Sequence, residues 1–215
     1  MSNREEVDAA KKEYIVCMGK PLGRLFYALV NEVEWLYIKW KEYIFLYGAE
    51  QSRIDLLNKV APLFFRVVQD LLFEGILLHI TRLTDPPKSA GRDNLTIQKI
   101  PPLVSDQRLT EILQSKIEVA LQRSVFCRDW RNRHIAHQDL QLVIEEGINP
   151  LQPANQKMVQ EALDAITDVL NTVILHYNRS EIGFGVMHNN GGGESLLDFI
   201  NDALGTEEED NGDFL

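Results

Sequence analysis

Apolar side chains recur every three or four positions along most of the chain, which is the spacing of one face of an α-helix. The longest clear example runs from Pro21 to Tyr47, and its apolar face consists of Leu22, Phe26, Leu29, Val33, Leu36 and Trp40. A shorter helix is predicted over residues 3–18, where Val7, Ala10, Tyr14 and Cys17 share one face. Glycines follow both stretches and are placed to end the two helices.

Residues 52–83 predict a further helix, kinked at Pro62. Ser52 is placed as its N-cap, because an acidic residue follows three positions later. Beyond Pro62 the apolar residues leave little polar face, which is typical of a helix central to a bundle. One apolar face of this helix leads to Arg82. We expect Arg82 to pair with Asp85, because an unpaired buried charge is costly.

The middle of the chain is less regular. Residues 85–105 contain four prolines and a glycine, which predicts a loop with at most one short helical turn near residues 96–99. Helical spacing resumes over residues 106–136, and its apolar face leads into Arg131 and His134. A loop over residues 138–152 and a last long helix follow.

Past Arg179 the helical pattern decays. Residues 191–193 are three glycines, typical of a flexible linker, and a short amphipathic helix is predicted shortly after them. We expect the final acidic residues to be disordered. Because no stretch predicts a convincing strand, the fold class is all-α. The predicted organisation is a bundle of four to five long helices over residues 1–180, followed by a linker, a short helix and an acidic tail over 181–215.

The formal net charge of −10 disfavours proteins that bind nucleic acid through a broad basic surface. The charge is uneven, however. Residues 201–215 hold six acidic and no basic residues, so they carry −6 and the other 200 residues carry −4 (−10 minus −6). Against that background the segment around residues 123–133 is locally basic, with a balance of +3 from Arg123, Arg128, Arg131, Arg133 and Asp129.

Our expectations for localisation and cofactors rest on features that are missing from the sequence. Cys17 and Cys127 lie far apart and outside any metal-ligand spacing, so we expect free thiols in a reducing compartment, no metal site and no cofactor. The first residues are too polar for a signal peptide, and no apolar run is long enough to span a membrane. The sequence therefore predicts a cytoplasmic protein without membrane contact.

The most chemically rich segment runs from Cys127 to Asp139 and holds three arginines, two histidines and an asparagine. A histidine can move a proton at neutral pH, and an arginine can hold a phosphate and stabilise charge as it is cleaved. An asparagine beside them can donate a hydrogen bond. Together these groups suit RNA cleavage by attack of the 2′-hydroxyl, a reaction that does not require a metal.

The run Arg131-Asn132-Arg133-His134-Ile135-Ala136-His137 resembles the motif of the HEPN superfamily (higher eukaryotes and prokaryotes nucleotide-binding). The wider context through Asp139, together with residues 81–85, is similar to the abortive-infection U-type branch. The resemblance covers roughly residues 20–180. It implies a helical bundle that dimerises along the motif-bearing helices, and in many members a metal-independent ribonuclease. It also implies that Arg131 binds phosphate, that Asn132 is the accompanying polar residue and that His137 is the general acid or base.

Other assignments of this segment stay open. Arg128 and His134 have the same spacing, but Asn132 and the Ala136-His137 pair match the motif better in the 131/137 frame. Arg128, Arg133 and His134 are then auxiliary RNA-binding residues, and Arg82, Asp85 and Asp139 are structural or orienting residues. Some members carry a tyrosine that a nucleotidyltransferase antitoxin modifies. That position is Asp139 here, which puts such control in doubt and leaves Asp139 able to orient His137.

Helix geometry bears on how the motif would work. Six positions on an ideal helix rotate by about 600°, so Arg131 and His137 would point about 120° apart unless the helix ends between them. Two facing motifs in a homodimer would form a composite site. The leading hypothesis is a homodimeric, metal-independent endoribonuclease in phage defence or a toxin–antitoxin system, with an antitoxin or nucleotidyltransferase as a possible partner. The alternative is a non-catalytic dimeric nucleotide-binding or scaffold protein.

Overall fold

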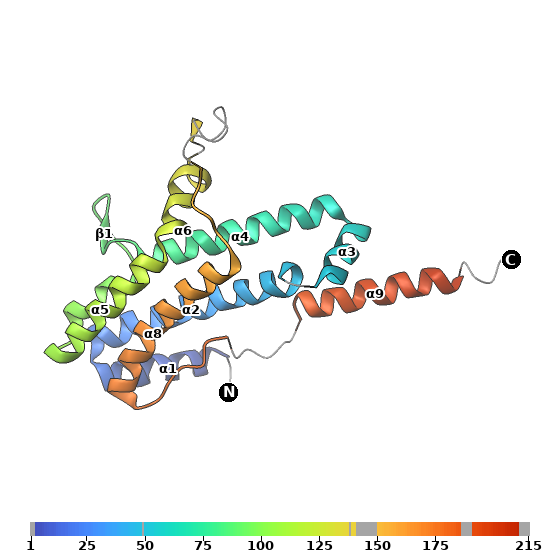
Figure 1. Ribbon diagram of the computed structural model, residues 1–215. Helices are drawn as coiled ribbons and strands as arrows, with labels where there is room; N and C mark the ends of the chain where they lie inside the picture. Colours follow the sequence, from blue (N-terminus) through green and yellow to red (C-terminus); the bar gives the residue numbers. More distant parts are fainter. Residues whose placement is uncertain (1–2, 49, 138, 141–149, 186–190, 211–215) are drawn as a thin grey trace. The chain divides into compact units, whose positions relative to one another are not determined.

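The computed structural model describes residues 3–48, 50–137, 139–140, 150–185 and 191–210, and most of this chain is helical (Figure 1). The predicted all-α class is therefore confirmed. The α-helices are α1 (Asn3–Met18), α2 (Lys20–Tyr47), α3 (Gln51–Val60), α4 (Pro62–Thr84), α5 (Gln107–Arg123), α6 (Val125–Trp130), α8 (Gln156–Asn178) and α9 (Gly193–Asp210).

A small hairpin interrupts the helices, which the loop prediction for residues 85–105 missed. Strand β1 (Lys88–Ser89) pairs antiparallel with β2 (Arg92–Asp93), and the 3-10 turns η1 (Ile97–Lys99) and η2 (Pro101–Leu103) follow. Two-residue strands are too short for an alternating pattern to reveal. The residues between the strands, Ala90 and Gly91, both have positive φ, as the tightest two-residue hairpin turns require.

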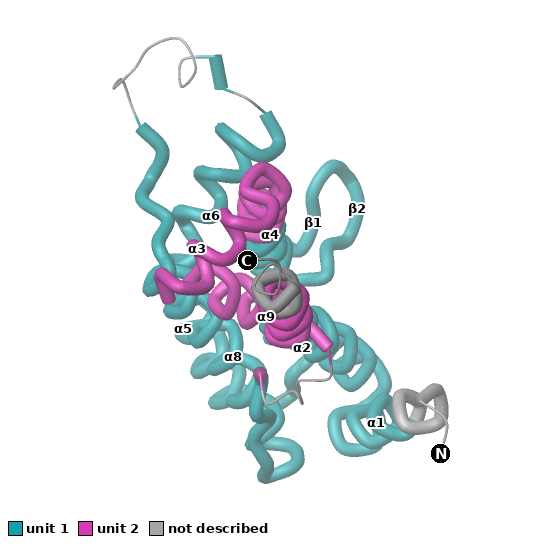
Figure 2. Tube along the Cα trace, turned by 90° about the vertical axis from the view of Figure 1, so that its right-hand side faces the viewer, with its two compact units in different colours: residues 1–37, 74–184 teal, residues 38–73, 185–215 magenta. Residues whose placement is uncertain are grey.

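The chain divides into two compact units by its internal contacts (Figure 2). Unit 1 comprises residues 1–37 and 74–184, and unit 2 comprises residues 38–73 and 185–215. Helices α2 and α4 therefore contribute residues to both units. The boundary near residue 180 that the sequence suggested stays a prediction.

The core of unit 1 is built from helix faces that the apolar spacing predicted. Helices α5 and α8 lie side by side (Figures 1 and 2). The Tyr37 hydroxyl on α2 lies 3.0 Å from the Thr167 hydroxyl on α8, which links these two helices as well. Buried residues come from α2 (Leu22, Phe26, Leu29, Val33, Leu36), from α5 (Leu109, Leu113, Ile117) and from α8 (Val159, Leu163, Ile166, Leu170, Val173).

Helices α1 and α2 approach each other closely at one glycine. A Cβ atom at Gly23 would lie 2.5 Å from the carbonyl oxygen of Tyr14 in α1, a contact that side chains cannot make. The rings of Tyr14 and Phe26 then meet edge to face, with centroids 5.0 Å apart. The absence of a side chain at Gly23 therefore allows the two helices to pack against each other.

Unit 2 has its own small core, formed by Leu46, Leu57, Phe65 and Leu197. The Glu42 carboxylate accepts a hydrogen bond from the backbone N–H of Gly193, at 2.6 Å, where α9 begins. Unit 2 is thus held by contacts between segments that are far apart in the sequence.

Several boundary predictions in unit 2 were wrong. The helix predicted over residues 52–83 is two helices separated at Ala61, and Glu50, not Ser52, is the N-cap of the first. The first half of α4 is not central, because its apolar side chains at 63, 64, 67 and 71 are 48–77% exposed. Helix α9 extends to Asp210, residues 211–215 lie outside the described chain, and the disorder expected of the acidic tail stays a prediction.

Candidate functional site

The motif lies on a helix that changes its hydrogen-bonding pattern at Arg131. The continuous helix predicted over 106–136 is in fact α5, a break at Ser124, the short α6, and a π-helical turn η3 (Arg131–Ile135). The turn is marked by the Ala136 N–H, which donates to the Arg131 carbonyl five residues earlier at 2.8 Å. Apolar spacing does not reveal such breaks, and single π-helical turns occur frequently at functional sites.

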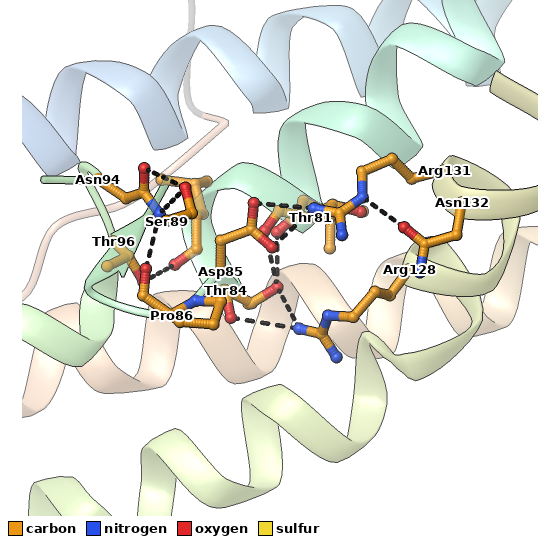
Figure 3. Close-up of polar contacts among 12 residues, drawn as sticks. Thr81, Thr84, Asp85, Pro86, Ser89, Asn94, Thr96, Arg128, Arg131 and Asn132 are labelled. Carbon is orange, nitrogen blue, oxygen red and sulfur yellow. Dashed lines mark hydrogen bonds and ion pairs between the residues drawn. The ribbon is translucent and has the colours of Figure 1, made fainter. Parts of the chain in front are cut away.

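The guanidinium of Arg131 is held in a defined orientation (Figure 3). Its Nη1 donates to both carboxylate oxygens of Asp85, at 2.8 and 2.9 Å, and its Nε donates to Asn132 Oδ1 at 3.0 Å. The two side chains of the ion pair are partly buried, with 27% of Arg131 and 19% of Asp85 exposed. Within the described residues Nη2 has no hydrogen-bond partner, so this nitrogen keeps two N–H donors for a ligand.

The predicted pairing of Arg82 with Asp85 is wrong. Arg82 Nη2 donates to Glu32 Oε2 on α2 at 2.7 Å, and the Arg82 side chain is 56% exposed. The buried His79 also lies against this oxygen, with its Nε2 atom 2.8 Å away. Asp85 follows the last residue of α4, so its side chain is no longer constrained to the helix face of Arg82. It binds Arg131 instead, and both arginines are paired.

Side chains satisfy the carbonyl groups at the end of α4. The Thr84 carbonyl accepts a hydrogen bond from Arg128 Nη2 at 3.2 Å (Figure 3). It also accepts one from Gln98 Nε2 at 2.9 Å. Gln98 also donates to the Asp85 carbonyl at 2.9 Å, and the Thr96 hydroxyl donates to the Leu83 carbonyl at 2.9 Å. The last carbonyls of a helix have no partner within the helix, so these contacts fix the backbone that carries Asp85.

A second group of polar contacts surrounds Arg133 and Asp129. Arg133 Nε donates to Asp139 Oδ2 at 3.2 Å, and Arg133 Nη1 lies 3.5 Å from Asp129 Oδ1. The other Asp129 oxygen accepts from the backbone N–H of Gln152, whose carbonyl accepts from Trp130 Nε1 at 2.8 Å. Asp139 thus binds Arg133, whereas the sequence suggested that it could orient His137. Most of the loop predicted over 138–152 lies outside the described residues.

The two histidines of the motif differ in their surroundings. His134 Nε2 lies 3.2 Å from Glu74 Oε1, and its ring packs edge-on against Trp130, with centroids 5.4 Å apart. His137 follows the π-helical turn, is exposed, and makes no side-chain hydrogen bond or ion pair with the described residues. The structure therefore places Arg131, Asn132 and Asp85 together, whereas His137 is available to a ligand or another chain.

Neither cysteine belongs to this site. Cys17 and Cys127 are free, and burial raises the pKa of the Cys127 thiol far above its usual value, so Cys127 is not a nucleophile. In the described part of the chain no group of three or more His, Cys, Asp or Glu side chains is arranged to hold a metal ion. Among the described helices none is long and apolar enough to cross a membrane.

Comparison with models of known protein families matches residues 19–199 to the HEPN_AbiU2 family, described as AbiU2. This chain belongs to the AbiU2 family of HEPN proteins. The resemblance stated from the motif and from residues 81–85 is therefore confirmed, and the function of this AbiU2-family protein is of the HEPN, abortive-infection type. No curated protein and no solved structure matches the chain.

Sequence reasoning missed one residue role in this AbiU2 protein. Asp85 was predicted to form an ion pair with Arg82, yet it is the partner of Arg131, 46 positions away in the chain. One signal could have indicated the pairing, since residues 81–85 and the 131–137 motif resemble the same family. Two segments that carry one family signature are candidates for one site, and here they do meet.

Proposed function

We propose that this protein is a metal-independent endoribonuclease in which Arg131 binds the scissile phosphate and His137 transfers a proton. The observation that carries the proposal is the geometry of Arg131. Asp85 and Asn132 hold two of its nitrogens, and Nη2 faces no described partner. A guanidinium that is already oriented stabilises developing phosphate charge without reorganising during the reaction.

Two arginine–histidine pairs have the spacing of the motif, Arg128 with His134 and Arg131 with His137, and their surroundings differ. Arg128 caps the end of α4, and His134 lies against Glu74, so this arginine and histidine serve local structure. His137 is exposed and has no described partner, as a proton-transfer residue that must reach substrate requires. We therefore assign the chemistry to Arg131 and His137. Auxiliary RNA-binding roles for Arg128, Arg133 and His134 remain proposals.

We propose further that two copies of the chain form the site. Within one copy Arg131 contacts Asp85 and Asn132, and no hydrogen bond joins it to His137 among the described residues. A two-fold axis near the motif would bring the Arg131 of one copy toward the His137 of the other. The exposure of His137 and the open Nη2 of Arg131 are compatible with such a composite site.

The ribonuclease proposal is tested with a mixed RNA pool and purified protein in EDTA. We expect the wild type to cleave, and to leave 2′,3′-cyclic phosphate ends, because the neighbouring 2′-hydroxyl is the nucleophile. The folded His137→Ala protein should leave the same pool intact. Cleavage by that variant at the wild-type rate would remove His137 from the mechanism, and wild-type activity that depends on a divalent metal would contradict the proposed chemistry.

A second candidate function is a non-catalytic dimeric nucleotide-binding or scaffold protein. The favouring observation is that Arg131 already has a carboxylate partner, which is how a purely structural arginine behaves, in a chain with a net charge of −10. For such a protein neither the wild type nor the His137→Ala variant cleaves RNA. Replacing Arg131 would then lower the thermal stability without changing any activity.

A further inference from the structure

A cavity of about 280 Å³ lies beside the Arg131–Asp85 pair in unit 1. Asp85 both lines this cavity and binds Arg131, so a ligand in the cavity would be one side chain away from the proposed phosphate-binding group. The volume is at the lower limit of small-molecule sites, which suits a single planar base. The cavity, called here the Glu32 pocket, is lined by Glu32, Arg82, Leu83, Asp85, Asp93, Asn94 and Leu95.

Two carboxylate oxygens of the Glu32 pocket have no hydrogen-bond partner among the described residues. In Glu32, Oε2 contacts both His79 and Arg82, which leaves Oε1 without a hydrogen bond. In Asp93, Oδ1 accepts from Lys99 Nζ at 2.8 Å, which leaves Oδ2. The hydrogen bond from Lys99 lowers the pKa of the Asp93 carboxyl, so this group is ionised at neutral pH. The pocket therefore offers acceptors and favours a ligand that brings N–H donors.

The pocket can nevertheless admit a polyanion. Each of its carboxylates has a cationic partner, since Glu32 pairs with Arg82, Asp85 with Arg131 and Asp93 with Lys99. The acidic residues therefore add little net negative charge around the cavity, and RNA can approach. Arginine guanidinium planes stack on unpaired RNA bases, and the Arg82 side chain lines the cavity and is 56% exposed.

We propose that the Glu32 pocket binds a guanine base of the RNA, next to the phosphate held by Arg131. This inference rests on the proposed ribonuclease function and adds its base specificity. The Watson–Crick edge of guanine presents two neighbouring donors. We pair its N1–H with Glu32 Oε1 and its N2 amino group with Asp93 Oδ2, the two carboxylate oxygens that have no partner among the described residues. Adenine and cytosine place an acceptor nitrogen beside their amino group, and uracil places carbonyls on both sides of its single N–H, so each would face a carboxylate with repulsive groups.

The test compares guanosine monophosphates with inosine monophosphates, which lack only the N2 amino group. Calorimetry on the full chain should use both the 3′- and the 5′-phosphates, because the base can lie on either side of the phosphate. We expect the preferred guanosine isomer to bind about tenfold more tightly than its inosine counterpart, the effect of one hydrogen bond to a charged acceptor. Equal affinities, or no binding of either guanosine isomer at millimolar concentration, would overturn the proposal.

Variants of the pocket make the test specific. Asp93→Asn should bring the guanosine-to-inosine affinity ratio close to one, and 65% of the Asp93 side chain is exposed, so this variant should fold. Glu32→Gln removes the acceptor for N1–H, which guanosine and inosine share, so it should weaken both ligands and keep their ratio; its contact with the buried His79 makes a melting curve necessary. The matched control is Asp70→Asn, which removes an exposed carboxylate paired with Arg66 and should keep both affinities. A ratio unchanged in Asp93→Asn would also overturn the proposal.

The nucleotide test and the ribonuclease test fail independently. Guanosine-selective binding without any RNA cleavage would contradict the ribonuclease and leave the base pocket in place. Conversely, RNA cleavage could continue unchanged when inosine replaces guanosine at each cleaved position, with no selective nucleotide binding. That result would contradict the proposed guanine pocket and would leave the ribonuclease proposal intact. Both results can be obtained with the same preparations of the full chain.

Discussion

The two ends of the HEPN motif are held in opposite ways. Arg131 is partly buried and receives two partners, one of them from the end of α4. His137 lies six positions later, beyond the π-helical turn, and is exposed without a described partner. The difference suggests a division of labour, in which the arginine is preorganised within one chain and the histidine completes the site on binding substrate or a second copy.

The largest effect on activity alone should come from His137→Ala. Loss of a positioned acid or base typically reduces a rate by about 10²–10⁴-fold. Because the side chain is exposed and has no partner among the described residues, thermal stability should not change. Cleavage rates and melting curves of the two proteins check this prediction. A large drop in melting temperature would mean that His137 has a structural role.

Arg131→Ala should reduce both activity and stability, which separates it from His137→Ala. We expect a rate loss of about 10²–10³-fold, because a preorganised group that stabilises charge is removed. The change also leaves the partly buried Asp85 unpaired, at a cost of about 1–2 kcal/mol, between the values for exposed and buried ion pairs. Cleavage assays and denaturant unfolding measure the two effects. An unchanged free energy of unfolding would mean that the pair with Asp85 does not form in solution.

Asp85→Asn should have an intermediate effect. The amide keeps the size of the side chain but weakens its hold on Arg131, and we expect about a tenfold lower kcat with a smaller change in KM. Asp70→Asn is the matched control, since Asp70 pairs with Arg66 on the exposed surface of α4. Single-turnover kinetics of both variants checks the prediction. Faster cleavage by Asp85→Asn would show that Asp85 restrains Arg131 from binding phosphate.

The smallest effect should come from Asp139→Asn. Its carboxylate binds Arg133, so the change should alter cleavage by less than about threefold, as expected for a partly exposed ion pair that includes neither Arg131 nor His137. Steady-state cleavage rates provide the measurement. A loss as large as that of His137→Ala would restore the alternative in which Asp139 orients His137.

The sequence predicted the helices better than their connections. The apolar face of α2 was identified because its six members, such as Leu22 and Phe26, recur with helical spacing, and all six are buried in the structure. The break at Ser124 and the π-helical turn at Arg131 were missed, because a local change in hydrogen bonding leaves the apolar spacing almost intact. The exposed apolar residues of α4 were missed because composition does not say whether a helix is covered.

For the site, the residues of the motif could be named from the sequence, but their partners could not. Pairing of Arg131 with Asp85 joins positions 46 residues apart, and it depends on the way Gln98 and Arg128 fix the end of α4. The nearest acidic residue in the sequence was therefore a poor guide for Arg82, which pairs with Glu32, 50 positions away. Local spacing does not encode such long-range contacts.

The most direct test of the proposed division of labour is subunit complementation. Arg131→Ala and His137→Ala proteins, each inactive alone, are mixed, allowed to exchange subunits and assayed on RNA. If the Arg131 of one copy works with the His137 of the other, each mixed dimer contains one intact site, and equal mixing should restore about one quarter of wild-type activity. No activity from a mixture in which mass spectrometry detects mixed dimers would contradict a site shared between two copies.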